Sequence, residues 1–190
     1  MLFYLLFLEV EKMNKDRKVA IWVGVLILLA YVVLVNSITD SKFLVTFFET
    51  ISGMAVIGIA VLMYPYFKFQ TKGVKYSYIS LKSIEGLLMI IAGFLFLSSS
   101  FLLRDSIYVW HTYIFIVSAF ILYVLLYKVN IIPKYLSIWG MVAAVLLLIG
   151  TLGEASGNTS MLISIIFMAP IVLNEFYLAI YLMVKGFNIK

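Results

Sequence analysis

Six long apolar segments, separated by short polar breaks, dominate the pattern of this chain. They cover residues 19–38, 44–66, 79–97, 107–127, 136–152 and 161–184. An α-helix needs about 20 mostly apolar residues to cross the hydrocarbon core of a bilayer, and the fifth segment, with roughly 17, is at the lower limit. The pattern therefore predicts an all-α polytopic membrane protein, a bundle of six transmembrane helices. The breaks are too short to fold independently, so residues 19–190 are expected to form one domain.

The composition favours lipid over water as the surroundings of this bundle. Of the 190 residues, 65% are hydrophobic and only 12% are charged, whereas soluble domains average about 45–50% apolar and about 25% charged residues. A soluble domain of this size has too little interior to bury so much apolar surface. We therefore expect the lipid bilayer as the main partner and a multi-pass location in the cell membrane.

The positions of the basic residues predict the orientation of the helices. With six alternating spans, all but two of the 14 Lys and Arg residues fall on the side that holds both termini, and only Lys42 and Arg104 fall on the other. Cytoplasmic loops carry the excess of Lys and Arg in membrane proteins, so both termini are predicted to be cytoplasmic. The net charge of +5 is then a topology signal, and no nucleic-acid partner is expected.

Residues 1–18 are set apart as an N-terminal segment. Residues 1–8 form an apolar run that is too short to span a bilayer and lacks the basic start of a signal peptide. Residues 13–18, which begin with Met13, read like a natural amino terminus. Two alternatives follow: translation starts at Met13, or residues 1–12 lie flat at the membrane interface.

Several kinds of chemistry lack the residues that they need. The chain contains no cysteine and one histidine, which excludes disulfides, cysteine-ligated metals, thiol catalysis and a bis-histidine haem. It also lacks zinc-protease, phosphate-loop and nucleophile-elbow motifs. The sequence therefore predicts neither a metal site nor a cofactor. His111, beside Trp110 and Thr112, is predicted to be a hydrogen-bonded interface residue.

Glu49, Glu85 and Glu175 lie within predicted spans, where a charge costs about 2.5–3.5 kcal/mol on insertion scales. Lys82 precedes Glu85 by three residues, which places both on one helix face, and Lys82 can extend toward the cytoplasmic interface. This pair either fixes helix packing or forms a ligand or proton site. Glu49 shares a face with small residues such as Gly53, so we expect it in a packing contact, with its carboxylate reaching a polar partner near the outer interface.

Glu175 is the deepest of the three carboxylates, about 15 Å from the end of its helix at a rise of 1.5 Å per residue. Its neighbour Asn174 belongs to a stripe at helical spacing that also contains Pro170, Tyr177, Tyr181 and Lys185. Such polar groups suit a lipid-facing surface poorly, so they are expected to point into the bundle. There they either line a cavity or bond to one another.

Three stretches carry a resemblance to a known family. They are Lys-Ser-Ile-Glu-Gly at 82–86, the middle with Tyr127, residues 130–136 and Trp139-Gly140, and the end with Pro170, Asn174-Glu175 and residues 181–186. From about Lys18 onward the chain resembles the microbial membrane family known as domain of unknown function 4386. The resemblance implies a compact six-helix bundle in which the glutamates of the third and last helices matter together. Lys82 stands where the family pattern has arginine and Tyr181 where it has tryptophan, and the family brings no established activity.

Three functions fit these features. In the first, a pocket between the third and sixth helices binds or transports a small protonatable or cationic ligand. Its candidate residues are Lys82, Glu85, Asn174, Glu175, Tyr177 and Tyr181, with the two glutamates as counter-charges. In the second, the protein is a structural or accessory subunit whose buried charges orient helices or meet a membrane partner protein. In the third, it is an enzyme acting on a lipid or quinone, with Glu175 as general acid or base.

Overall fold

The fold is all-helical, as predicted, in the part of the chain that the computed structural model describes, residues 14–39, 41–157 and 160–188. The elements are α2 (Lys15–Ala30), η1, a 3₁₀ helix (Tyr31–Ile38), α3 (Lys42–Met63), η2 (Tyr64–Phe67), α4 (Lys72–Leu97), α5 (Phe101–Val129), α6 (Lys134–Ala155) and α7 (Met161–Val184). The alternatives for residues 1–12 lie outside the described residues.

Six helices in the described ranges are long and apolar enough to cross a membrane, which confirms the predicted number of spans. Several of them extend beyond the apolar segments: α4 begins at Lys72 and α5 at Phe101, six or more residues before the predicted starts. A helix satisfies its own backbone hydrogen bonds in water as well as in lipid, so it continues past the point where the hydrocarbon ends. The α-helix of the first span ends earlier than predicted, at Ala30, and the 3₁₀ helix η1 continues the segment from there.

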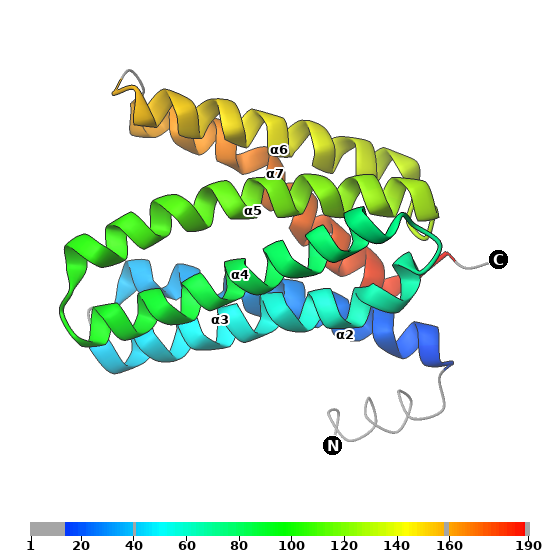
Figure 1. Cartoon of the computed structure of the whole chain (residues 1–190), viewed down its shortest axis with the longest axis horizontal. Coiled ribbons are helices and arrows are strands. Elements are labelled where there is room, and N and C mark those ends of the chain that lie inside the picture. Colours follow the sequence, from blue (N-terminus) through cyan, green and yellow to red (C-terminus); the bar gives the residue numbers. More distant parts are fainter. Residues whose placement is uncertain (1–13, 40, 158–159, 189–190) are drawn as a thin grey trace.

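The helices form a closed ring in which each packs against its sequence neighbours and α7 returns to pack against α2. Figure 1 shows α7 running beside α6 at one end and crossing toward α2 at the other. The guanidinium of Arg17 on α2 donates hydrogen bonds to the carbonyl oxygens of Met183 and Val184, at 2.7 Å and 2.8 Å. The start of α2 and the end of α7 therefore lie at the same end of the bundle, called the terminal end below.

The ring carries its apolar side chains outward and several polar ones inward. Large apolar residues such as Val61, Phe94 and Leu173 are more than half exposed on the outer surface. In contrast, Glu49, Ser52, Lys82, Glu85, Ser118, Ser137 and Asn174 are buried. This distribution suits a surface that faces lipid tails. Together with the six long apolar helices, it makes the chain a multi-pass membrane protein.

Glycines bring two pairs of helices into backbone contact. A Cβ atom on Gly53 of α3 would overlap the carbonyl oxygen of Gly86 on α4, and the reverse holds for Gly86. A Cβ on Gly24 of α2 would lie 2.6 Å from the carbonyl oxygen of Ala179 on α7. Such close approach of two helices is possible because glycine has no side chain to separate the backbones.

Candidate intramembrane binding site

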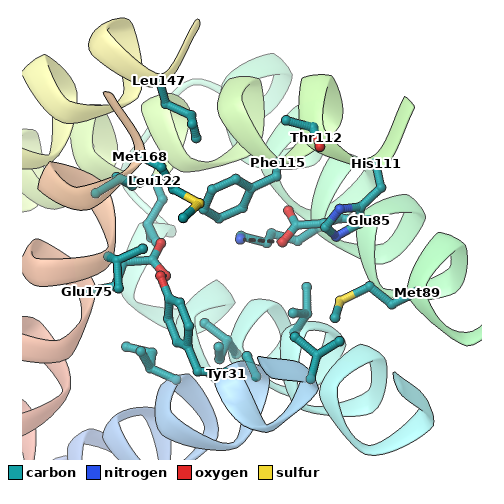
Figure 2. Close-up of a pocket in the computed structure, with 18 of the residues that line it drawn as sticks. Tyr31, Glu85, Met89, His111, Thr112, Phe115, Leu122, Leu147, Met168 and Glu175 are labelled. Carbon is teal, nitrogen blue, oxygen red and sulfur yellow. Dashed lines mark hydrogen bonds and ion pairs between the residues drawn. The ribbon is translucent and has the colours of Figure 1, made fainter. Parts of the chain in front are cut away.

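A cavity of about 220 Å³ lies inside the ring, and all six long helices contribute to its lining. Most of the lining is apolar, with Phe115 and Leu122 from α5 and Met168 from α7 among the larger side chains. Its polar lining residues include Tyr31, Lys82, Glu85, His111, Thr112 and Glu175. Figure 2 shows Glu175 and Tyr31 on one side of this space and Glu85 and His111 on the other.

One wall of the cavity holds a buried ion pair. Lys82 Nζ lies 3.0 Å from Glu85 Oε1, and both side chains are at most 5% exposed. Ser118 of α5 donates a hydrogen bond to the other oxygen, Glu85 Oε2. The Lys82 ammonium also lies 5.2 Å from the centre of the Phe115 ring. Glu85 therefore has a partner on each oxygen, and the predicted pairing of Lys82 with Glu85 is confirmed.

The expectation that Lys82 extends toward the membrane interface is wrong. Its residue is only 4% exposed, because the ammonium turns toward Glu85, one turn farther along α4, and lies inside the bundle. At this depth Glu85 and the face of the Phe115 ring stabilise the ammonium.

Glu175 occupies the α7 wall of the cavity. Its Oε2 atom accepts a hydrogen bond of 2.8 Å from the hydroxyl of Tyr31. Within the described ranges this neutral phenol is the one hydrogen-bond donor found for Glu175, and no basic residue forms an ion pair with it. Glu85 and Glu175 thus line the same cavity, one with a cationic partner and one with a phenol.

The other polar residues of the α7 stripe do not line the cavity. Asn174 is fully buried but turns toward α6, where its amide donates to the carbonyl oxygen of Leu136 at 3.1 Å. Tyr177 is 46% exposed, and its hydroxyl lies 3.3 Å from that of Tyr135 on the outer surface. Tyr181 is half-buried against the apolar core.

The prediction that the whole stripe points into the bundle is therefore wrong. One residue turns a helix by about 100°, so Glu175 can face the cavity while its neighbour Asn174 faces α6. Asn174 and Tyr177 lie on the side of α7 that packs on α6, since their hydrogen-bond partners Leu136 and Tyr135 both belong to α6.

His111 is a lining residue that the sequence did not point to. Its Nε2 atom is buried and has no hydrogen-bond partner among the described residues, and its ring lies 5.9 Å from that of Tyr108. The prediction of a hydrogen-bonded interface residue is wrong at this atom. Since α5 begins at Phe101, His111 lies about 15 Å along the helix. The apolar segment, which begins at residue 107, had placed it only about one turn from the helix start.

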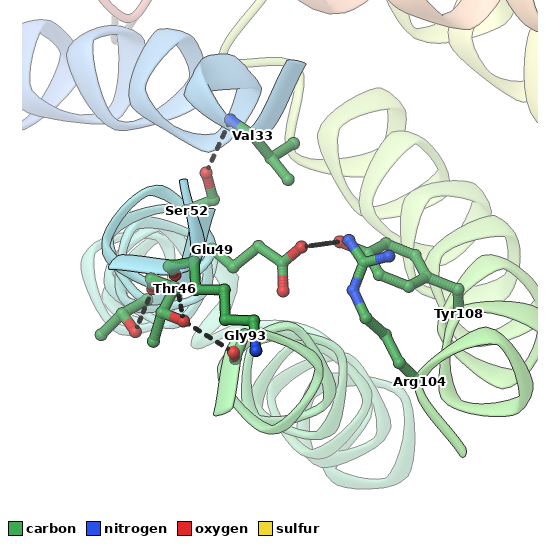
Figure 3. Close-up of polar contacts among 9 residues, drawn as sticks. Val33, Thr46, Glu49, Ser52, Gly93, Arg104 and Tyr108 are labelled. Atoms are coloured by element: carbon green, nitrogen blue, oxygen red, sulfur yellow. Dashed lines mark hydrogen bonds and ion pairs between the residues drawn. The ribbon is translucent and has the colours of Figure 1, made fainter. Parts of the chain in front are cut away.

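A second polar cluster joins α3 to α5 (Figure 3). It lies between the cavity and the end of the bundle remote from the termini. The Glu49 carboxylate, which is fully buried, accepts hydrogen bonds of 2.7 Å from Arg104 Nη2 and 2.7 Å from the Tyr108 hydroxyl. Arg104 also lies 4.8 Å from the centres of the Phe96 and Tyr108 rings. The prediction that Glu49 reaches a polar partner is confirmed, and its partners are Arg104 and Tyr108.

One carboxylate of the cavity, that of Glu175, has no basic partner among the described residues. Among residues 14–39, 41–157 and 160–188, no group of three His, Asp or Glu side chains is placed to hold a metal ion. A carboxylate facing an apolar cavity attracts a positively charged partner, because burial without one is costly.

The fold and this cavity define a class, that of multi-pass helical membrane proteins with an internal, partly charged pocket. Residues 100–186 match the model of a family described as Domain of unknown function (DUF4386). The resemblance predicted from the sequence is thus confirmed over α5, α6 and α7, a range that includes His111 and Glu175. The Lys82–Glu85 motif precedes the matched residues. No curated protein and no solved structure matches the chain.

Proposed function

We propose that this protein binds a small protonatable or cationic molecule in the cavity, with Glu175 as its counter-charge. The observation that carries the proposal is the setting of Glu175, whose carboxylate lines an apolar cavity and is held by the Tyr31 phenol. A cationic ligand would supply the charge compensation that a buried carboxylate needs. Glu85 has its own cation in Lys82, whereas Glu175 has none, so a ligand that carries one positive charge would balance Glu175 in its ionised form.

The size of the cavity indicates the size of the ligand. An engineered protein cavity of about 150 Å³ accommodates benzene, and this cavity is somewhat larger, at about 220 Å³. The rings of Phe115 and Tyr31 line it beside the carboxylate, and aromatic faces attract cations as well as apolar groups. A single aromatic ring with a short alkylamine chain, such as 2-phenylethylamine, combines the matching volume with the matching charge.

The binding proposal predicts a charge-selective response to such amines. In detergent, 2-phenylethylamine should raise the thermal unfolding midpoint of the wild type, because a ligand that binds the native state stabilises it by mass action. The neutral isostere 2-phenylethanol should have no comparable effect. Glu175→Gln should remove the response to the amine, and Glu154→Gln, a change at an exposed glutamate of α6, should leave it intact.

A different result would favour the alternative of a structural or accessory subunit. That alternative draws support from Glu85 and Glu49, since both carboxylates already pair within the bundle. It predicts that Glu175→Gln changes the midpoint by the same amount with and without amines, and that no arylalkylamine stabilises the wild type. A search for a membrane partner protein would then follow.

We also propose that the protein resides in the cell membrane with both termini in the cytoplasm. In support, many of the described basic residues, such as Arg17, Lys72 and Lys134, lie at the terminal end. Because the chain has no cysteine, single cysteines can report the orientation. On intact cells a membrane-impermeant thiol reagent should label Ser156→Cys, between α6 and α7, and should label Thr71→Cys only after permeabilisation. The reverse pattern would overturn this topology.

A further inference from the structure

We infer that the cavity fills from the side, through a mouth between η1 and α7 that faces the lipid, so that its ligands are amines that partition into the bilayer. This inference rests on the proposed function for the identity of the ligand. The route itself follows from how the ring is closed at its ends and open at one flank.

Toward the terminal end the cavity is closed by a layer of aliphatic side chains. Ile27, Ile59, Leu122 and Leu178 line the cavity and also surround the next void in that direction. That void measures only about 10 Å³ and is completed by Val23, Met63, Leu126 and Leu182. A hydrated cation could not cross this layer without losing its water in an apolar environment, which is a large cost.

Toward the other end lies the cluster of Glu49, Arg104 and Tyr108. It joins α3 to α5, two helices that are not neighbours in the ring, and therefore bridges across the interior. Tyr108 also contacts His111 at the rim of the cavity. A charge-assisted network of two hydrogen bonds at 2.7 Å is among the stronger polar contacts, so specific interactions hold α3 to α5 across this part of the end.

The flank between α2 and α7 has a different geometry. Near the terminal end the two helices meet closely, where Gly24 faces the backbone of Ala179. Farther along, α7 leaves α2 but stays packed on α6, where Gly150 lies against Phe167. Pro170 falls between the two crossings and lacks the N–H that would bond to the carbonyl of Ile166, which favours a change of direction. Over the same stretch α2 continues into η1, which packs on α3.

The cavity reaches the outer surface where the two elements diverge. Leu34 of η1 and Met168 of α7 both line it, yet they are 57% and 43% exposed. Both belong to membrane-spanning segments, so the mouth that they flank opens to hydrocarbon. An amphipathic amine dissolved in the bilayer can enter here with its apolar part against Leu34 and Met168. Its amino group then comes to Glu175, five residues beyond Pro170.

Cysteine labelling tests this route without any need for the amine. Val172→Cys would place a thiol in the cavity lining, on a chain that has no other cysteine. Two matched variants serve as controls: Leu173→Cys, whose position is 60% exposed on the outer face of α7, and Ser156→Cys at the end of the bundle. The protein is placed in lipid nanodiscs, where both ends of the bundle meet water. It is treated with an uncharged bilayer-soluble maleimide or with a sulfonated water-soluble maleimide.

We expect the bilayer-soluble reagent to label Val172→Cys and Leu173→Cys, and the sulfonated reagent to label only Ser156→Cys. Adding Met168→Trp should slow labelling of Val172→Cys at least ten-fold and leave Leu173→Cys unchanged. Labelling of Val172→Cys by the sulfonated reagent, protection of that thiol from both reagents, or indifference to Met168→Trp would each overturn lateral entry. Failure of amine binding alone would instead refute the proposed function and leave the route standing.

Discussion

Lys82→Met should lower the free energy of unfolding by about 3–5 kcal/mol, the usual cost of removing one partner from a buried ion pair. The ammonium lies 3.0 Å from Glu85 in a site where both side chains are at most 5% exposed. Without it, Glu85 would keep only the hydrogen bond from Ser118. Reversible unfolding in mixed detergent micelles measures the loss.

The double variant Lys82→Met/Glu85→Leu provides the matched control. Apolar replacement of a complete buried pair is often neutral or stabilising, and Ser118 can still donate to the carbonyl oxygen of Phe115, 3.0 Å away. The double variant should therefore recover most of the stability that Lys82→Met loses. A loss under about 1 kcal/mol in the single variant, or an equal loss in both, would contradict the assignment of a desolvated pair.

The second large effect is expected at the cluster that joins α3 to α5 toward the end of the ring remote from the termini. Arg104→Met should cost about 3 kcal/mol, the lower end of the range for breaking a buried pair, since Tyr108 still donates to the fully buried Glu49. Arg104 is 19% exposed in its side chain, which moderates the effect. The measurement is again unfolding in mixed micelles.

Two further variants separate geometry from charge at this cluster. Arg104→Lys keeps the charge but loses the planar fork of donors, so its stability should fall between those of the wild type and Arg104→Met. Lys42 is the other basic residue predicted to lie on the side of the membrane opposite to the termini, and it is exposed. Lys42→Met should therefore change stability by less than about 0.5 kcal/mol. Equal effects of Arg104→Met and Lys42→Met would argue against a specific Glu49–Arg104 pair.

The number of spans was predictable because hydrophobic length in a bilayer is a strict requirement. The positions of the helix ends were not, since residues such as Lys72 and Phe101 continue their helices beyond the apolar segments. Lys82 and His111 each lie ten residues after the start of their helix, farther than the apolar boundary indicated. Their settings inside the bundle depend on contacts with other side chains, which the apolar pattern does not report.

The candidate site was predictable only where the signal was local. Lys82 and Glu85 lie three residues apart on one helix, and their pairing follows from helical geometry alone. Which face of α7 meets the cavity depends instead on its neighbours α2 and α6, which a single sequence does not specify. For that reason Tyr31 was missed as the partner of Glu175. Asn174 is buried in the bundle, as predicted, but faces α6 and not the cavity, and Tyr177 lies on the outer surface.

The two cavity glutamates therefore have different roles in this account. Glu85 belongs to a closed set with Lys82 and Ser118 that fixes α4 against α5. Glu175 has a neutral partner and faces the cavity, which leaves it able to meet a ligand. Mutations at Glu85 should act mainly on stability, and mutations at Glu175 mainly on binding.

Titration calorimetry of 2-phenylethylamine into the purified protein tests the central proposal most directly. The account predicts one binding site per chain in the wild type and in Glu154→Gln, and affinity at least ten-fold weaker in a folded Glu175→Gln variant. Equal affinity in all three proteins, or no saturable binding of this or any related arylalkylamine, would contradict the role of Glu175 as the counter-charge of a ligand.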